Sequence, residues 1–298
     1  MYQRAITKEI EEIARIELNE TPQIRKEALE HMEEWIKKQS QINLNTGATR
    51  LLDGLRLLNF LRGCKFSTQK TKNKVEAYLK VKHSIPEIFY NRDPFSPPLQ
   101  DLLKNGCITP FGTPDKECVI FRWGVCNPRV VCFADIIKCG VMIWDIFLNE
   151  NDTCMAVGHY VIIDCRDFSL AILTQLSPSL VKRMLVDMLL AYPLRIKGVY
   201  FINGIVAIET FYNVLKPILS TKLQNRIHFY GNDYSDIFNT IPKQYFPKDY
   251  GGSNSSFDEL TEEWKVKMES LRQWFLEDVM FPFRSEIWFW TTNFRNII

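Results

Sequence analysis

Apolar residues recur at helical spacing through roughly the first 90 residues of the chain. In residues 21–38, TPQIRKEALEHMEEWIKK, they line one face behind Thr21, a residue type that caps helices, and Pro22, which suits the first helical position. Residues 51–62 and 71–90 repeat the pattern. The sequence therefore predicts a small, all-helical N-terminal domain.

The pattern changes after residues 91–100, NRDPFSPPLQ, where three prolines interrupt any helix. Short runs rich in β-branched and aromatic residues then predict buried strands. These runs are CVIFRW (118–123), HYVIID (159–164), GVYFIN (198–203) and NRIHFYG (225–231). Helical patterns at 134–148, 177–191 and 206–222 alternate with them. This order predicts an α/β domain with a mostly parallel sheet flanked by helices.

The predicted division of the chain is a helical domain over 1–92, an α/β domain over 93–255 and a helical tail over 256–298. The loop PKDYGGSNSS (247–256) separates the last two parts, and apolar residues again recur at helical spacing beyond it.

The helical segment 205–222 carries an unusually wide apolar arc. Positions 205, 208, 212, 215 and 219 form one stripe, and 211, 214 and 218 form a second beside it. A helix that covers a sheet needs one such stripe, so the second faces either more core, a ligand or a bilayer. Pro217 within the segment predicts a bend at which a lid hinges.

Charge and composition restrict the class of partner. The chain has 37 Lys and Arg residues against 35 Asp and Glu residues, which argues against broad binding to nucleic acid. The most apolar windows, 136–148 and 184–194, are too short and too charged to cross a bilayer. Acidic residues occupy the N-terminus where a secretory signal is basic and apolar. We expect a soluble, cytoplasmic protein.

Common catalytic motifs are missing from the sequence. It contains no GxGxxG after a strand, no GxxxxGK[ST] and no GxSxG, and its four histidines are scattered. Its eight cysteines form no CxxC pair, so we expect reduced and mostly buried thiols. His159 and Asp164 border one strand, but Asp164 beside Arg166 is typical of a turn or cap. We expect no catalytic residues, no metal site and no enzymatic activity.

Two basic pairs have a spacing that suits a phosphate. Arg195 and Lys197 alternate on an extended stretch and so share one side, whereas Lys222 and Arg226 are one helical turn apart. Taken alone, most such pairs are solvated surface, but each can hold a phosphate group.

Four stretches together resemble the CRAL-TRIO family, and within it the tocopherol and retinaldehyde carriers. They are LLNFLRGCKF (57–66), YPLRIKGVYFIN (192–203), KPILSTKLQNRIHFYG (216–231) and FPKDYGG (246–252). The resemblance implies a helical N-terminal domain and a sheet domain that encloses a lipid pocket, closed by a mobile lid helix.

The resemblance also implies two sets of site residues. The lipid pocket is formed by Ile137, Gly140, Val141, Trp144, Val161, Ile163, Met184, Met188, Leu194 and Val199, with Val206, Phe211, Leu215, Ile218 and Leu219 on the lid. A phosphoinositide headgroup is bound by Arg62, Arg195, Lys197, Lys222 and Arg226. Cys64 departs from the family pattern, which has an arginine there, and Arg195 and Lys197 exchange the usual order of lysine and arginine.

The implied function is intracellular transfer of a hydrophobic molecule, such as a tocopherol or a retinoid, between membranes by a monomeric protein. Release is expected to be coupled to transient contact with anionic, phosphoinositide-containing membranes. Two alternatives stay open at this point: exchange of phosphatidylinositol or another phospholipid, and an interaction module that transports nothing.

Overall fold

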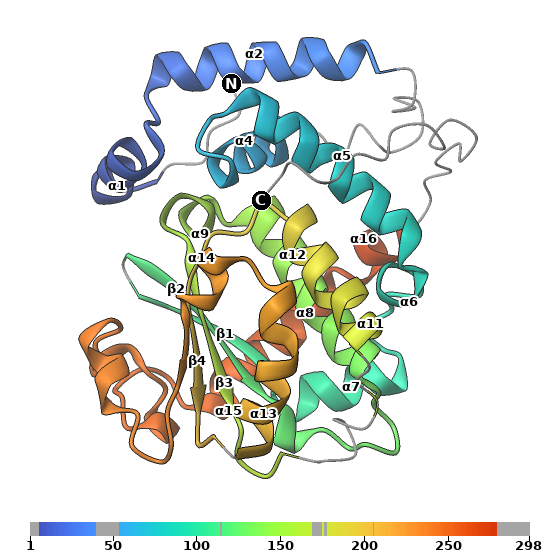
Figure 1. Ribbon diagram of the computed structural model, residues 1–298, viewed down its shortest axis with the longest axis vertical. Coiled ribbons are helices and arrows are strands. Elements are labelled where there is room, and N and C mark those ends of the chain that lie inside the picture. The colour runs from blue at the N-terminus through green and yellow to red at the C-terminus, as the bar shows by residue number, and fades with distance from the viewer. Residues whose placement is uncertain are drawn as a thin grey trace.

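Figure 1 shows the computed structural model of the chain. The structure describes residues 6–39, 54–113, 115–168, 175, 178–204 and 206–278. At 178–179, 185–186, 206–207, 211 and 214 it describes the backbone alone.

The N-terminal part is helical, as the sequence predicts. Its helices are α1 (Lys8–Leu18), α2 (Pro22–Lys37), α4 (Gly54–Gly63), α5 (Thr68–Ser84) and α6 (Pro86–Phe89). The Thr21 side chain caps α2 by accepting a hydrogen bond from the Ile24 amide at 3.2 Å. The segment expected as one helix from 71 to 90 is divided between α5 and α6, because Pro86 disfavours helical backbone at Ile85 (φ −125°, ψ 68°).

A five-stranded sheet forms the centre of the rest of the molecule. Its strands are β1 (Ile108–Thr113), β2 (Lys116–Arg122), β3 (His159–Asp164), β4 (Ile196–Ile202) and β5 (Ile227–Phe229), and they lie in the order β1-β2-β3-β4-β5. β1 runs antiparallel to β2, and the other neighbours are parallel. The four predicted strands are confirmed, and β1 was not among them.

The connections between the parallel strands lie on one face of the sheet, because right-handed crossovers between strands in sequential order all turn to the same side. They contain α8 (Phe133–Glu150), α9 (Asp152–Val157), α11 (Pro178–Val181), α12 (Asp187–Ala191), α13 (Val206–Leu215) and α14 (Thr221–Gln224). A π-helical turn at Lys182–Val186 joins α11 to α12. Figure 1 shows α8, α12 and α13 on one side of the sheet and the segment 232–256 on the other.

The expectation that Pro217 lies inside one long helix is wrong. α13 ends at Leu215, a 3-10 turn follows at Lys216–Ile218, and Ser220 caps the separate helix α14. Proline lacks the amide hydrogen that a continuing helix needs and its ring clashes with the preceding turn, so the helix ends before it. The backbone therefore changes direction between two helices instead of bending within one.

The second face of the sheet is covered by the C-terminal part of the chain. Ile120 and Ile162 pack there with Phe246 and Phe257. Helices α7 (Pro97–Lys104), α15 (Phe257–Ser270) and α16 (Arg272–Glu277) complete the structure, and α15 contacts both β1 and α7. Short 3-10 turns occur at Trp123–Val125, Ser235–Asn239, Lys243–Tyr245 and Lys248–Tyr250. The mixed α/β fold with helices around a mainly parallel sheet is confirmed. The domain boundaries stay predictions.

Candidate functional site

The face of the sheet beneath the crossover helices is apolar along several strands. Side chains alternate between the two faces of a strand, so Val161 and Ile163 of β3 point to the same side. Parallel pairing places Val161 beside Val119 of β2 and Val199 of β4. All of these residues belong to one apolar cluster.

Helix α8 packs on this face through residues that are three or four positions apart. Ile137, Val141 and Trp144 are buried in the same apolar cluster. Gly140 faces the same layer, and a Cβ atom there would make ordinary contacts, 3.6 Å from side-chain atoms of both Ile108 and Phe121.

The structure brings most of the predicted pocket residues into this one layer between sheet and helices. Those buried in it are Ile137, Val141, Trp144, Val161, Ile163, Met184, Met188 and Val199, with Leu194 partly buried against them. Met184 lies in the π-helical turn, a wide turn that occurs often at functional sites, and Met188 follows in α12. Methionine side chains adapt to ligands of irregular shape.

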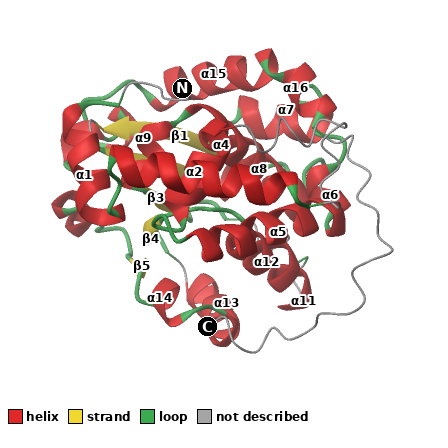
Figure 2. Ribbon diagram, turned by 90° about the horizontal axis from the view of Figure 1, so that it is seen from above, coloured by secondary structure: helices red, strands yellow, loops and turns green. Residues whose placement is uncertain are grey.

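The predicted lid residues are placed differently. Leu215 is buried at the end of α13 but outside that cluster, and Ile218 and Leu219 are half-buried in the turn that follows. Val206 and Phe211 belong to α13, and their side chains lie outside the described residues. Figure 2 shows α13 and α14 at the margin of the molecule, on the side of the sheet where β5 lies.

Aromatic side chains outside the predicted pocket set connect α13 to the sheet. Phe201 of β4 stacks on Phe229 of β5 with ring centroids 4.7 Å apart, and Tyr212 of α13 lies 5.0 Å from Phe229. Ile208 of α13 is also buried in the apolar cluster. The alternation of Val199 and Phe201 on one strand was the signal that could have added Phe201 to the site.

Two of the predicted basic residues share one acidic partner within the protein. Glu17 of α1 accepts hydrogen bonds from Arg195 Nη2 at 2.6 Å and from Lys197 Nζ at 2.5 Å. Burial alone would raise the pKa of Glu17, but these two partners hold the pKa of the carboxyl below its ordinary value. For the cation Arg195, burial disfavours the charged form and therefore lowers the pKa.

Lys222 and Arg226 extend this positive region across α14. Lys222 is exposed and Arg226 is half-buried, where its guanidinium donates to the Ile196 carbonyl. The pKa of Lys222 is lowered by burial and by the charges of Arg226, Lys65, Arg195 and Lys70. We refer to the following residues as the basic cluster: Lys65, Lys70, Arg195, Lys197, Lys222 and Arg226.

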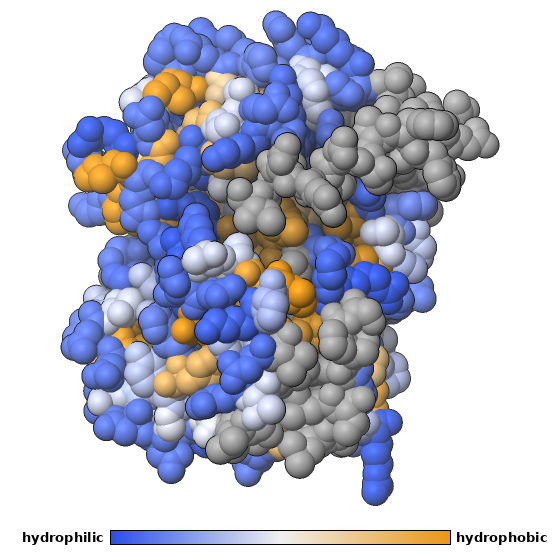
Figure 3. All heavy atoms as spheres, viewed as in Figure 1, coloured by the Kyte–Doolittle hydropathy of each residue, from blue (hydrophilic) through white to orange (hydrophobic). Residues whose placement is uncertain are grey.

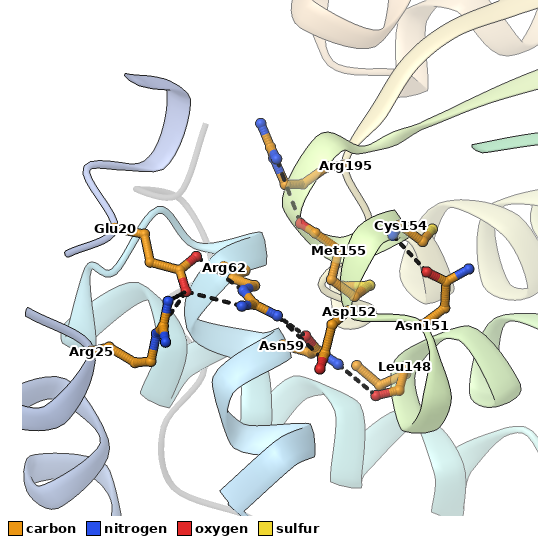
Figure 4. A network of polar contacts seen from close by, with 10 residues as sticks. All are labelled: Glu20, Arg25, Asn59, Arg62, Leu148, Asn151, Asp152, Cys154, Met155 and Arg195. Carbon is orange, nitrogen blue, oxygen red and sulfur yellow. Dashed lines mark hydrogen bonds and ion pairs between the residues drawn. The ribbon is translucent and has the colours of Figure 1, made fainter. Parts of the chain in front are cut away.

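Arg62 lies apart from that cluster, in a buried network (Figure 4). Its guanidinium pairs with Glu20 at 3.0 Å and with Asp152 at 3.2 Å, and it also donates to Asn59 at 3.3 Å. Only 1% of the Arg62 side chain is exposed. The network joins the segment between α1 and α2 to α9, so in this conformation Arg62 holds two parts of the fold together.

Asp164, the strand-end carboxylate considered for catalysis, is also held by internal partners. It accepts hydrogen bonds from Asn203 and Tyr250, both at 2.8 Å, and pairs with Arg166. These bonds fix the turn after β3. Within the described ranges, no three His, Cys, Asp or Glu side chains gather in a way that could hold a metal ion. No described helix is both long and apolar enough to cross a bilayer.

Comparison with known protein families identifies two domains in the chain. The CRAL/TRIO domain matches residues 104–252, from the end of α7 through the last 3-10 turn. The chain belongs to the CRAL/TRIO family. A Pinta-like UBA domain matches residues 21–99, in the helical N-terminal part. CRAL/TRIO proteins bind and transfer lipids, so the apolar layer under α8 and α12 is the candidate lipid site.

Individual proteins are similar to this chain over most of its length. The alpha-tocopherol transfer protein-like protein of Homo sapiens is 25% identical over 287 residues, which cover 94% of this chain and 80% of that protein. Clavesin-1 of Rattus norvegicus is 26% identical over 251 residues, covering 83% and 69% of the two chains. The crystal structure of Sfh5 has a TM-score of 0.50 at 12% identity and covers 70% of this chain and 75% of that one.

Proposed function

We propose that this CRAL/TRIO protein carries one hydrophobic small molecule of isoprenoid size, such as a tocopherol or a retinoid, through the cytoplasm as a monomer. The molecule lies between the sheet and helices α8, α12 and α13. Contact with an anionic, phosphoinositide-containing membrane opens the site and couples headgroup binding to release. The proposal includes no catalytic step.

One observation carries the proposal: the apolar layer and the basic cluster share strand β4. Val199 of β4 belongs to the apolar layer, while Lys197, two residues earlier, and Arg195, just before the strand, belong to the basic cluster. A lipid site and an anion site built on one strand can respond to each other, because a shift of that strand changes both.

The expected strength of ligand binding makes assisted release necessary. Burying roughly 400 Å² of an isoprenoid at about 25 cal/mol per Å² contributes on the order of 10 kcal/mol before the costs of association. Spontaneous escape into water is then slow. A membrane supplies an apolar phase that accepts the ligand without exposing it to water.

Apolar and basic side chains near α14 suit contact with a membrane surface. Leu190 of α12 is 61% exposed, and Ile218 and Leu219 are half-buried close in sequence to the exposed Lys222. Figure 3 shows apolar residues gathered on the face that carries α12, next to hydrophilic ones. Each basic residue near an anionic leaflet adds about 1 kcal/mol of attraction.

The test measures transfer of a fluorescent tocopherol analogue to vesicles that contain phosphatidylinositol 4,5-bisphosphate. We expect Lys222→Ala with Arg226→Ala to slow transfer at least fivefold, because two charges that attract the membrane are lost. Affinity for the analogue in solution is expected to stay near that of the unmodified chain.

A matched control removes two exposed lysines elsewhere, Lys104→Ala in α7 and Lys243→Ala in the segment 243–245. This variant has the same net charge as the first and is expected to transfer at the unmodified rate. Equal slowing of transfer in both variants would mean that net charge alone causes the effect. Unchanged transfer in the Lys222→Ala, Arg226→Ala variant would reject the coupling between headgroup binding and release. Mass spectrometry of the lipid that co-purifies distinguishes an isoprenoid from an exchanged phospholipid.

A further inference from the structure

His159, the first residue of β3, is buried and incompletely hydrogen-bonded. Only 1% of the residue is exposed, and its Nε2 atom has no hydrogen-bond partner among the residues that the structure describes. Large surveys find a partner for most buried side-chain polar atoms, so an atom of this kind calls for an explanation.

The position of His159 relates it to the lipid site. Its side chain points to the same face of β3 as Val161 and Ile163, which are walls of the apolar layer. Its ring centroid lies 6.4 Å from that of Trp144 on α8. The imidazole therefore lies at one end of the apolar layer. Arg195 is next to this end of β3, because its carbonyl oxygen accepts a hydrogen bond from the His159 amide at 3.0 Å.

A neutral imidazole offers Nε2 as a hydrogen-bond donor when its other ring nitrogen, Nδ1, accepts a hydrogen bond. Burial and the nearby Arg195 charge lower the pKa of His159 to about 4, so the ring is neutral near pH 7. Nδ1 faces the Cys154 Sγ at 3.9 Å, and burial raises the pKa of that thiol, which keeps its proton. When the thiol proton is directed at Nδ1, the ring proton resides on Nε2.

We propose that His159 Nε2 anchors the polar end of the ligand by donating a hydrogen bond to its hydroxyl or carbonyl oxygen. The ligand class that follows is a long hydrophobic molecule with one such oxygen at its end. This inference rests on the proposed function, because it requires a ligand between sheet and helices. It adds selection of an oxygen-bearing molecule over a hydrocarbon of the same shape.

A second buried donor provides the rival assignment. Trp123 Nε1 also has no hydrogen-bond partner within the described part of the chain. Trp123 follows the last residue of β2, so it lies at the other end of the sheet from His159, the first residue of the parallel strand β3. The Trp123 ring packs between Phe133 and Phe168, with centroids 6.4 Å and 5.6 Å away. His159 is the stronger candidate because it shares a face of β3 with the predicted pocket residues Val161 and Ile163 and lies against a third, Trp144. The aromatic neighbours of Trp123, Phe133 and Phe168, are not among the predicted pocket residues.

The experiment compares binding of phytol, an isoprenoid alcohol, with binding of phytane, the saturated hydrocarbon of the same chain, to the full-length protein. The unmodified chain is expected to bind phytol about tenfold more tightly, since a hydrogen bond to an otherwise unpartnered buried donor is gained. His159→Leu is expected to bind both molecules equally. His159→Gln retains an N–H donor and is expected to keep a preference for phytol.

Two further variants complete the design. Tyr160→Phe removes a hydroxyl from the opposite face of the same strand, where Tyr160 stacks on Tyr200, and is expected to keep the full preference. Trp123→Phe removes the rival donor and is expected to do the same. Circular dichroism and urea unfolding confirm that each variant is folded.

The outcomes separate the two proposals. Binding of neither molecule to the folded, unmodified chain would reject the proposed carrier of isoprenoids, and the anchor with it. Binding of both without preference, or a preference that survives in His159→Leu, would reject the anchor alone. Loss of the preference in Trp123→Phe would assign the anchor to Trp123 instead.

Discussion

Arg195 and Glu17 form an ion pair in which Nη2 lies 2.6 Å from Oε2. The same carboxylate oxygen accepts from Lys197, so one side chain of α1 occupies two cations of the basic cluster. A phosphate group that binds Arg195 and Lys197 has to replace Glu17. Under the proposed function, helix α1 therefore competes with an anionic headgroup for this part of the surface.

Removal of the Glu17 charge is expected to strengthen membrane binding. Glu17→Gln frees Arg195 and Lys197 to act on an anionic leaflet, and about 1 kcal/mol of added attraction corresponds to roughly a fivefold higher affinity. Co-sedimentation with vesicles that contain phosphatidylinositol 4,5-bisphosphate measures the change. The gain is expected to shrink as salt is added, because screening weakens exposed charges.

Glu12→Gln is the matched control for that variant. Glu12 lies on the same helix and pairs with Arg15 at 2.6 Å, in a contact where both side chains are more than half exposed. The change in net charge is the same, but no residue of the basic cluster is released. An equal gain for Glu12→Gln, or no gain for Glu17→Gln, would contradict competition at Arg195 and Lys197.

Arg62 is expected to contribute to stability far more than an exposed arginine does. Arg62→Ala leaves the Glu20 and Asp152 carboxylates buried without this partner, which costs about 3–5 kcal/mol in comparable buried ion pairs. Arg15→Ala, which breaks an exposed pair, is expected to change the free energy of unfolding little. Urea unfolding measures both. A cost below 1 kcal/mol for Arg62→Ala would show that the network does not stabilise the fold.

The sequence predicted the elements of the fold better than their ends. Runs of β-branched and aromatic residues fixed four of the strands, because burial on both faces of a sheet requires apolar side chains throughout. β1 was missed since Pro110 and Gly112 interrupt its pattern, yet an antiparallel strand at the edge of a sheet tolerates both. Pro86 and Pro217 divided helices that periodicity alone had joined.

The candidate site was predictable where one element presents a periodic face, and not where several elements meet. Val161 and Ile163 follow from alternation on one strand. Glu17, by contrast, lies 178 residues from Arg195 in the sequence, so only the folded structure reveals their contact. Arg62 shows the converse, because a motif identifies an arginine but not whether its charge faces solvent or a buried carboxylate.

Acid is expected to destabilise the protein through His159 between about pH 6.5 and pH 4. The ordinary pKa of histidine, about 6.5, applies to the unfolded chain, whereas burial lowers the pKa in the folded chain to about 4. The unfolded state therefore gains a proton first as pH falls. The stabilisation is complete above pH 6.5, and about 3 kcal/mol is lost by pH 4.

The measurement is the difference in free energy of unfolding between the unmodified chain and His159→Gln across that range. The difference isolates His159 from its titratable neighbours Glu117, Cys154 and Arg195. Glu117 acts in the opposite direction, because burial raises the pKa of its carboxyl. A constant difference from pH 7 to pH 4 would mean that His159 titrates normally and is not buried in solution.

Gly158 is expected to be essential for the junction of β3 and the basic cluster. Its φ of +81° is a conformation that residues with a side chain rarely adopt, and a Cβ atom would lie 2.5 Å from the Arg195 carbonyl oxygen. Gly158→Ala should therefore push Arg195 away from β3 and cost about 3 kcal/mol or more. Gly112→Ala in β1 is the control, since its Cβ atom would come no closer than 3.6 Å to Glu117.

The measurements are the melting temperature and co-sedimentation with vesicles. Gly158→Ala should lower both the melting temperature and the fraction of protein bound to vesicles, and Gly112→Ala should leave both nearly unchanged. If Gly158→Ala melts like the unmodified chain, the close approach of β3 to Arg195 does not exist in solution, and the link between strand position and the basic cluster fails with it.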